Sequence, residues 1–592
     1  MAGPLNAVFQ AVWAVFYIFF KVAFFWQRRF WDWLWQKSTR DLLLETISDA
    51  RRFEEWEAAA FELDRCLNYD MWRMNPMDKL YQYRLIEHRL DAIHEAQATG
   101  DVLGLINILR TGLVRHLGNI TAPKLYNRAY AGTKTLIEDY ITQVVYAAQS
   151  LREYRTDGDS LMSTQEKLNL FHSSRQAFGR SVLVLQGGAI FGLCHLGVVK
   201  ALHMQNLLPR IISGTATGAI IAALVCVRTR ESLLDSLSGQ RIDLTAFSNR
   251  PYRNGVGPST WLGTLTRRVK RWWREGHFLD VDVLEQLLQD NIGNITFEEA
   301  YEQTRMVLNI TVTTSRGGSV PNLLNYITAP NVLIWSAALA SNATSSSTLY
   351  HPVTLMSKDE NGNIVPWPIA EGASFRPHTH ASYGVRRSPL HRMGELFNVN
   401  HFIVSQARPY LVPFLRSDLH HPNPKQDGRW KLSKPILRFF VLEVQHRLQQ
   451  MDQLGLLPLS IRRFLLDENI PGPSLTLVPE LTPSDFLKLL ENPTEESIDY
   501  WILRGERSVW PAITALKIRC AIEYELDMGY QMVRRRRRSD AGPTSNSTVG
   551  ARRRGSRSSA QSIHANAGES SVSTTNVTRE ARAASLSGGL GP

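Results

Sequence analysis

The stretch Leu183–Leu202 reads LVLQGGAIFGLCHLGVVKAL, and it decides the fold class. The β-branched run before Gln186 is typical of a parallel strand that is buried on both faces. The run ends in Gly187 and Gly188, and helical spacing begins after Gly192. A strand, a glycine turn and a helix in this order indicate an α/β domain.

The glycine turn is one candidate for chemistry. A glycine turn that enters a helix presents free backbone N–H groups to an anion. It could hold a phosphate, a dinucleotide or an oxyanion, and a tight turn without chemistry is an equal alternative. A nucleotide is the weakest of these interpretations. The turn lacks a P-loop lysine, and no acidic residue follows about 20 positions later to hold a ribose.

A second strand–turn–helix stretch, Ile211–Leu224, reads IISGTATGAIIAAL. Gly214 and Gly218 are four positions apart, which is the spacing of a nucleophile elbow, the G-x-S-x-G turn that lifts a serine hydroxyl above the sheet. In this chain the middle position is Ala216, which has no hydroxyl.

Short apolar runs near Ile211, Val307 and Phe402 predict further strands, and helical stretches separate them. This alternation predicts a mostly parallel sheet. Before it, apolar residues at three- and four-residue spacing predict helices, with Gly100 and Asp101 between two of them.

These patterns divide the chain into five parts. We expect a hydrophobic anchor at 1–37, a helical module at 38–165, an α/β domain at 180–415, a helical extension at 416–530 and a disordered basic tail at 533–592.

The N-terminal segment predicts association with a membrane or a lipid surface. The run Leu5–Phe20 carries no charge, and Arg28, Arg29 and several tryptophans follow it. Because about 20 apolar residues are needed to span a bilayer, the run is borderline. An anchor lying in the interface or forming a hairpin fits better than a full span, and a buried helix is the alternative.

The net charge of +12 invites a nucleic-acid interpretation, but its distribution argues against one. The tail from Val533 onward holds eleven arginines against three acidic residues, so the other 532 residues carry only about +4. The tail could bind anionic lipid, act as a nuclear-localisation signal or be merely solvated. We expect no nucleic-acid partner.

The four cysteines are widely separated and form no CxxC pair, which predicts free, buried thiols. His378 and His380 form an H-x-H pair without other ligands at metal spacing, so we expect no metal. Neither pattern indicates a cofactor.

The two turns together resemble the patatin-like phospholipase family. WEAAAFELD from Trp56, GTKTLIEDY around Lys134 and ELFNVNHFIVSQARPYLVPF around Asn398 are similar to the fungal and plant triacylglycerol lipases of lipid droplets. The resemblance runs from about Arg51 to Asp527. It implies a patatin-like three-layer α/β domain and a Ser–Asp dyad in which serine attacks the ester carbonyl.

The resemblance also implies roles for particular residues. Gly187, Gly188 and Ala189 correspond to the oxyanion turn, with Ala189 in place of a third glycine. The nucleophile position is Ala216. The acid position corresponds to Glu371 of Glu371-Gly372-Ala373, after which SFRPHTHASYGVRRSP interrupts the match.

Two functions follow from this resemblance. One is an acyl hydrolase acting on acylglycerols or phospholipids at lipid droplets or the endoplasmic reticulum, facing the cytosol. The other is a catalytically inactive paralogue that binds acyl lipid or regulates an active lipase. The sequence leaves the oligomeric state open.

Other polar residues are weaker candidates. Thr215 and Thr217 flank Ala216, but an elbow presents only one side chain at its apex. His195 is interpreted as a packed residue rather than a base. Asn398, together with Asn400 and His401, either structures a turn near the site or makes capping and turn hydrogen bonds.

Overall fold

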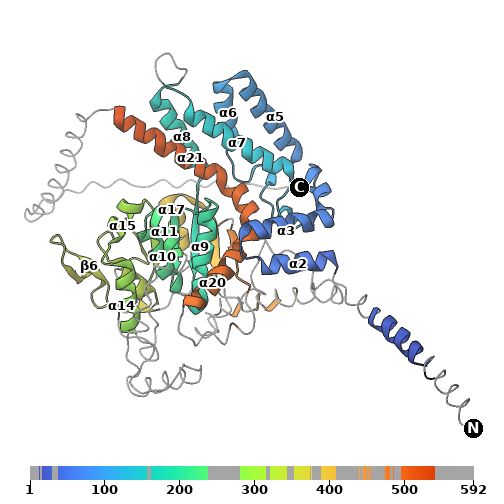
Figure 1. The fold of residues 1–592 in the computed structure, drawn as a ribbon. Helices are drawn as coiled ribbons and strands as arrows, with labels where there is room; N and C mark the ends of the chain where they lie inside the picture. The colour runs from blue at the N-terminus through green and yellow to red at the C-terminus, as the bar shows by residue number, and fades with distance from the viewer. Residues whose placement is uncertain are drawn as a thin grey trace, which may run out of the picture. The chain divides into compact units, whose positions relative to one another are not determined.

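The computed structural model describes residues 13, 16–29, 38–156, 162–187, 189–237, 281–314, 320–342, 353–373, 375–376, 388–407, scattered positions from 439 to 485 that include 474–480, and 495–540. The chain divides into two compact units, Met1–Tyr530 and Gln531–Pro592. The first unit contains the predicted helical module and α/β domain (Figure 1).

The first part of this unit is helical, in agreement with the 3.6-residue periodicity. Gly100 ends one helix in the left-handed conformation, with φ 68°, and the Asp101 side chain caps the next by accepting from the Gly104 N–H. The helices are α2 (Thr39–Asp49), α3 (Phe53–Cys66), α4 (Tyr69–Met74), α5 (Tyr83–Thr99), α6 (Val102–Gly112), α7 (Thr135–Glu153) and α8 (Thr164–Phe178).

The main sheet has six strands in the order β10-β9-β1-β2-β3-β5. All neighbours pair in parallel except β3 and β5, which are antiparallel. The strands are β1 (Arg180–Gln186), β2 (Ile211–Thr215), β3 (Val307–Thr311), β5 (Leu323–Leu324), β9 (Val399–Gln406) and β10 (Ser474–Leu477). The predicted strand runs therefore form the centre of the sheet, and β10 arises within the stretch expected to be a helical extension.

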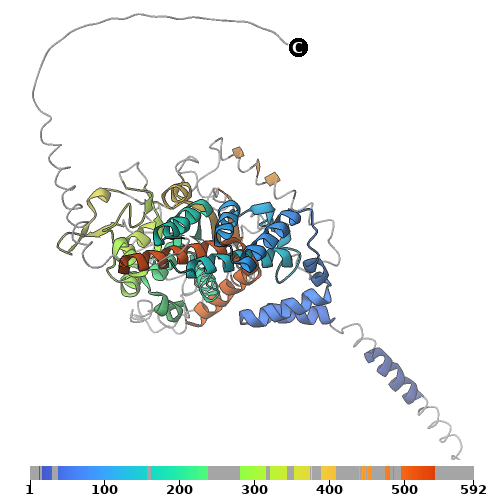
Figure 2. The same cartoon turned by 90° about the horizontal axis from the view of Figure 1, so that it is seen from above.

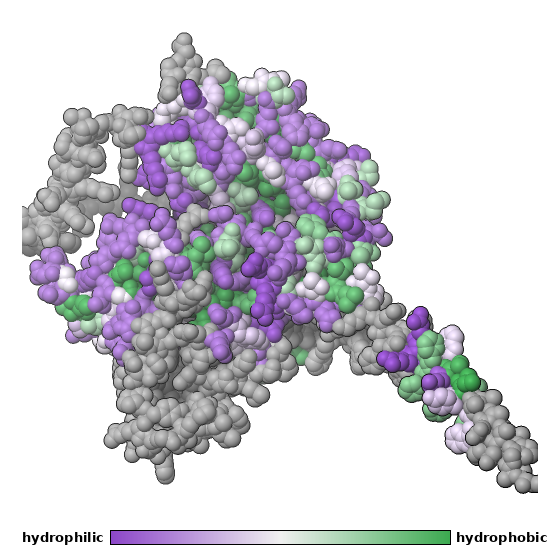
Figure 3. Space-filling model, in the orientation of Figure 1, coloured by the Kyte–Doolittle hydropathy of each residue, from purple (hydrophilic) through white to green (hydrophobic). Residues whose placement is uncertain are grey.

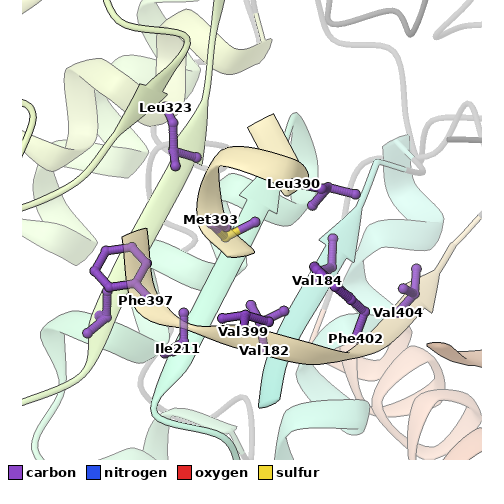
Figure 4. Close-up of a cluster of buried hydrophobic side chains, with 11 residues drawn as sticks. Val182, Val184, Ile211, Leu323, Leu390, Met393, Phe397, Val399, Phe402 and Val404 are labelled. Atoms are coloured by element: carbon purple, nitrogen blue, oxygen red, sulfur yellow. The ribbon is translucent and has the colours of Figure 1, made fainter. Parts of the chain in front are cut away.

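Helices cover both faces of the sheet. On one face Leu390, Met393 and Phe397 of α17 (Pro389–Phe397) pack against alternate strand residues such as Val182 and Val184 (Figure 4). Leu183 and Leu185 point to the other face, because successive strand side chains alternate. There α10 (Thr217–Val227) contacts β1, β2 and β3.

The remaining elements surround this framework. Two short ribbons pair β4 (Thr313–Thr314) with β8 (Phe375–Arg376) and β6 (Met356–Lys358) with β7 (Ile364–Pro366). The helices are α9 (Cys194–Met204), α11 (Arg230–Leu237), α14 (Val281–Ile292), α15 (Phe297–Thr304), α16 (Ile334–Asn342), α20 (Glu495–Val509) and α21 (Ile513–Asp540), and 3₁₀ turns include η3 (Ala189–Leu193) and η4 (Pro368–Ala370).

The helix at 16–29 exposes large apolar side chains. Phe16, Phe19 and Trp26 are between 64% and 72% exposed. Figure 3 shows hydrophobic and strongly hydrophilic residues side by side on this helix. None of the helices in the described part of the chain is long and apolar enough to cross a membrane.

The cysteine prediction holds for three of the four thiols. Cys194, Cys226 and Cys520 are free and buried. Cys66 is free but exposed, so its interpretation as a buried residue is wrong. It is the last residue of α3, beyond the face that buries Trp56 and Leu63.

A buried arginine joins three parts of the chain. Arg115 follows α6, and its guanidinium lies 3.1 Å from the Glu523 carboxylate of α21. It also donates to the Ser181 Oγ of β1 at 3.2 Å and to the Asn400 Oδ1 of β9 at 3.3 Å. Glu523 in turn accepts from the Ser181 N–H at 2.7 Å. In Figures 1 and 2, α21 accordingly runs between the first helices and the sheet.

His401 lies beside this network, so that Ser181, His401 and Glu523 superficially resemble a catalytic triad. Their arrangement differs, because Glu523 accepts from Ser181 directly and His401 Nδ1 is 3.2 Å from the same hydroxyl. His401 and Ser181 are also buried, at 0% and 1% exposure. Burial and the nearby Arg115 and Arg519 hold the pKa of His401 well below its usual value. The arrangement is therefore a structural network.

Arg115→Ala should lower the free energy of unfolding by about 3–5 kcal/mol, because it leaves the Glu523 carboxylate buried without its cation. Urea denaturation followed by circular dichroism measures this. Arg110→Ala, at an exposed position on α6, is the matched control and should change stability by less than about 0.5 kcal/mol. Equal, small losses in both variants would contradict a central role for Arg115.

Candidate functional site: two turns at the carboxyl ends of the central strands

The two predicted turns lie next to each other at the carboxyl ends of the central strands. β1 and β2 pair in parallel, with Gln186 opposite Thr215. Gly187 continues this register, and its N–H donates to the Thr215 carbonyl at 3.1 Å. Ligands of open α/β sheets bind at this edge, beyond the carboxyl ends of the strands. The structure therefore brings the glycine turn and the elbow into one site.

Ala216 has the backbone conformation of an elbow apex. Its φ is 53° and its ψ is −125°, at the junction between β2 and α10. This combination lies outside the regions that L-residues normally occupy. Holding it costs of order 1–3 kcal/mol, which the surrounding structure has to offset. The elbow is thus strained although it carries a methyl group instead of a hydroxyl.

The elbow glycines are required by close backbone approach. A Cβ on Gly214 would overlap the Gly218 carbonyl, and a Cβ on Gly218 would overlap the Leu185 carbonyl of β1. Neither neighbour is a flexible side chain, so both positions exclude larger residues. The roles of Gly214 and Gly218 in a nucleophile elbow stay predictions.

The end of α16 clamps the apex. The Ala216 N–H donates to Ser341 Oγ at 3.0 Å, and that hydroxyl donates to the Thr311 carbonyl of β3 at 2.8 Å. The Asn342 side-chain amide donates to the Ala216 carbonyl at 3.0 Å and to the Ala338 carbonyl at 2.9 Å. Both polar groups of the Ala216 backbone are therefore held from one helix end, about 125 residues further along the chain.

The two threonines that flank Ala216 make contacts with neighbouring segments. Thr215 Oγ1 bonds to Thr311 Oγ1, which itself donates to the Gly214 carbonyl. Thr217 is the first residue of α10, and its side chain lies where a Cβ on Gly192 would be. Neither threonine takes the place of a hydroxyl on Ala216.

His195 contacts the backbone of the glycine turn. Gly187 has a φ of 47°, which favours glycine. His195 Nε2 lies 3.3 Å from the Gly187 carbonyl, and its Nδ1 lies 2.8 Å from Ser405 Oγ of β9. Complete burial lowers the pKa of His195 to about 4. The imidazole is therefore neutral at pH 7 and can donate to Gly187 while accepting from Ser405, which agrees with its interpretation as a packed residue.

The rest of the predicted oxyanion turn is only partly described. Gly188 lies outside the described residues, and Ala189 begins the 3₁₀ turn η3 that leads into α9. The roles of Gly187, Gly188 and Ala189 as oxyanion donors stay predictions, and the Gly187 N–H is engaged by the Thr215 carbonyl.

Glu371 lies on a turn after η4, four residues before β8. β8 pairs with β4, which follows β3, and β8 also contacts α16. This places the segment on the side of the elbow. The Glu371 residue itself is exposed, and within the described part of the chain its carboxylate makes no hydrogen bond. Its role as the catalytic acid stays a prediction.

The remaining candidate residues lie either outside the described residues or at the edge of the sheet opposite the elbow. His378 and His380 lie outside the described residues. Asn398 and Asn400 lie at the amino end of β9, where they donate to the Gln176 and Phe178 carbonyls at 2.8 Å. This is the edge opposite the elbow, so the capping interpretation is correct and the placement near the site is wrong.

Sequence reasoning missed Ser341, Asn342 and Ser405. Each acts through a hydrogen bond to a residue more than 100 positions away, and a lone Ser or Asn in an apolar stretch carries no distinguishing signal. Among the described residues, no group of three or more His, Cys, Asp or Glu side chains could hold a metal ion.

Asn342→Ala should lower the free energy of unfolding by about 1 kcal/mol, because the Ala216 carbonyl loses the Asn342 amide and keeps only the Ala219 N–H as a donor. In an Ala216→Gly background the same change should cost about half as much, since glycine adopts the apex conformation without strain. A double-mutant cycle in urea measures this coupling. Additive effects of the two substitutions would show that Asn342 does not restrain the apex.

Comparison with known proteins supplies the family. Residues 183–373 match the model of the patatin-like phospholipases, and residues 32–176 match a domain of unknown function. The triacylglycerol lipase ptl1 of Schizosaccharomyces pombe is 35% identical over 81% of this chain and 83% of its own length. The triacylglycerol lipase ptl3 of the same yeast is 30% identical over 83% of this chain and 97% of its own.

Two further similarities extend the comparison. The triacylglycerol lipase SDP1L of Arabidopsis thaliana is 34% identical over 81% of this chain and 57% of its own length. Among solved structures, VipD from Legionella pneumophila covers 59% of this chain and 67% of its own with a TM-score of 0.23, too low to support an argument. On the sequence evidence, the chain belongs to the patatin-like phospholipase family and is close to the fungal triacylglycerol lipases.

Proposed function

We propose that this protein is a catalytically silent member of the triacylglycerol lipase branch, which binds acylglycerol or phospholipid in its elbow site. The carrying observation is Ala216, which occupies the apex in the elbow conformation with both backbone groups clamped. A silent site of this kind would act in lipid breakdown by holding acyl lipid or by regulating an active lipase.

Among the described residues, the Thr215 hydroxyl beside the apex does not replace the missing one. Thr215 is bonded toward β3, and a nucleophile displaced by about 1 Å loses of order 10²-fold in rate. The predicted acid is a glutamate on an exposed turn rather than an aspartate held against the elbow. Two altered members of the dyad make turnover at the level of an intact lipase physically unreasonable.

The scaffold still supports binding. Ala216 and its two neighbours are partly accessible, whereas the elbow glycines are buried. The glycine turn beside them keeps its left-handed Gly187 and the adjoining start of a helix. The relatives are named as triacylglycerol lipases, which supports an acyl ester as the ligand class.

Purified wild type should release no fatty acid from emulsified triacylglycerol or phospholipid above background. Ala216→Ser should gain about 10²-fold over wild type, and adding Glu371→Asp should raise the rate further, because the serine–aspartate dyad is then complete. The control is Thr215→Ala/Thr217→Ala. If wild type hydrolyses lipid and this control does not, the threonines supply a displaced nucleophile and the protein is an enzyme.

Lipid binding tests the same proposal through a signal that a silent protein should still give. A fluorescent triacylglycerol analogue should bind wild type and lose most of its affinity for Ala216→Trp, which places a large side chain at the partly accessible apex. Ala98→Trp, on an exposed position of α5, is the matched control. Equal binding by all three proteins would place the lipid elsewhere and overturn the silent-site proposal.

We further infer that residues 1–37 hold the protein at a lipid droplet or at the cytosolic face of the endoplasmic reticulum. Supporting this, the helix at 16–29 exposes Phe16, Phe19 and Trp26, and Arg28 and Arg29 follow. Amphipathic segments with aromatic residues and flanking cations favour the headgroup boundary.

A chain lacking residues 1–37 should move from the lipid surface to the soluble fraction, because most of the exposed aromatic area is lost with it. Fluorescence microscopy and flotation of tagged protein measure the change. The replacement of Phe16, Phe19 and Trp26 by serine is the matched variant and should have the same effect. Retention of both variants on droplets would eliminate this segment as the anchor.

A further inference from the structure

A row of arginines lies at the amino edge of the sheet, opposite the elbow. Arg180 is the first residue of β1, Arg210 directly precedes β2, and Arg305 lies two residues before β3. Arg175 on α8 joins them. β2 spans five residues, so this edge is about 17–20 Å from Ala216 at ~3.3 Å per residue.

These arginines gather around one carboxylate. Asp527 of α21 lies 3.0 Å from Arg175, 2.9 Å from Arg210 and 3.7 Å from Arg180. In the described part of the chain, these ion pairs join one carboxylate to three guanidinium groups, so the four residues together carry a net positive charge. Arg210 leaves 43% of its side chain exposed, which opens the cluster to solvent.

Aromatic rings extend the row. The Arg305 guanidinium lies over the Tyr301 ring at 5.6 Å, and Tyr301 stacks on Tyr326 with 4.1 Å between centroids and a 6° interplanar angle. Arg180 is close enough to Tyr326 to lower its pKa, although burial of the ring raises that pKa more. Ile327, the next residue, is 50% exposed.

We define the arginine–tyrosine stripe by six residues: Arg175, Arg180, Arg210, Arg305, Tyr301 and Tyr326. Four of them are cations. The acidic residues beside them in the described part of the chain are Asp527, which pairs with three of the arginines, and the exposed Glu302, which follows Tyr301. The guanidinium groups are also held in place, by ion pairs or by an aromatic ring.

We propose that the arginine–tyrosine stripe docks an acidic segment of a partner protein. The positive charge of the stripe is complementary to an acidic segment. Arginine and tyrosine are also enriched in protein–protein interfaces. A lipid surface is the less favoured occupant. Under the proposed function, a lipid surface contacts the elbow edge of the sheet, and the stripe lies at the opposite edge. The choice of a protein over a lipid surface therefore rests on the proposed function.

The test uses the full chain and a fluorescein-labelled peptide of ten glutamates, with binding followed by fluorescence anisotropy. Wild type should bind it, and Kd should rise with salt because the contact is electrostatic. Arg210→Gln/Arg305→Gln should weaken binding about tenfold. The matched control is Arg84→Gln/Arg110→Gln, where Arg84 is an exposed arginine over the Tyr83 ring. It should change Kd less than twofold.

The remaining outcomes decide against the stripe. Both double variants keep the basic tail, so equal losses would show that the peptide responds to net charge alone. If the stripe variant instead loses sedimentation with phosphatidylserine vesicles and keeps peptide binding, the stripe is a membrane contact and the proposal fails.

A second measurement uses wild type alone, so it remains informative if a variant folds poorly. Hydrogen–deuterium exchange of wild type with the peptide should slow at residues 299–306 and 175–182, and unchanged exchange there would overturn the proposal. Neither experiment depends on lipid binding or hydrolysis. Peptide binding can therefore be interpreted even if the proposed function is wrong.

Discussion

The structure depends on the buried ion pair between Arg115 and Glu523. Arg115 comes from the helical module, Glu523 from α21, and both bond to the first residues of the central strand through Ser181. Two charges in a low-dielectric interior are costly unless each is paired and hydrogen-bonded. The helical module, the sheet and α21 therefore have to assemble together, and the part that matches a domain of unknown function is integral to the patatin-like core.

This assembly leaves the opposite edge of the sheet for the site. The amino ends of the strands are occupied by Arg115, Asn400 and the arginines around Asp527. The carboxyl ends carry the glycine turn and the elbow, and α10 begins there with its positive end toward this edge. The two edges have different chemistry because the parallel strands all run in the same direction.

The elbow shows that conformation and chemistry are separable. Its backbone is imposed by strand pairing, by two glycines without room for a Cβ and by the Ser341–Asn342 clamp. None of these contacts involves the side chain at the apex. The backbone frame therefore holds with an alanine at the apex, and a silent lipid-binding site is a coherent proposal for this fold.

Local sequence patterns were sufficient to predict much of the fold of this protein. The strand runs, the Gly100–Asp101 break and the elbow spacing follow from residues close together in the chain, because periodicity and glycine placement are local properties. The identity of Ala216 is also a fact of sequence. Tertiary structure alone decided what holds the site: Ser341, Asn342 and Ser405 reach it across more than 100 residues, and Asn400 and His401 proved to lie at the far edge. Such contacts arise from strand order and helix packing, which no local pattern encodes.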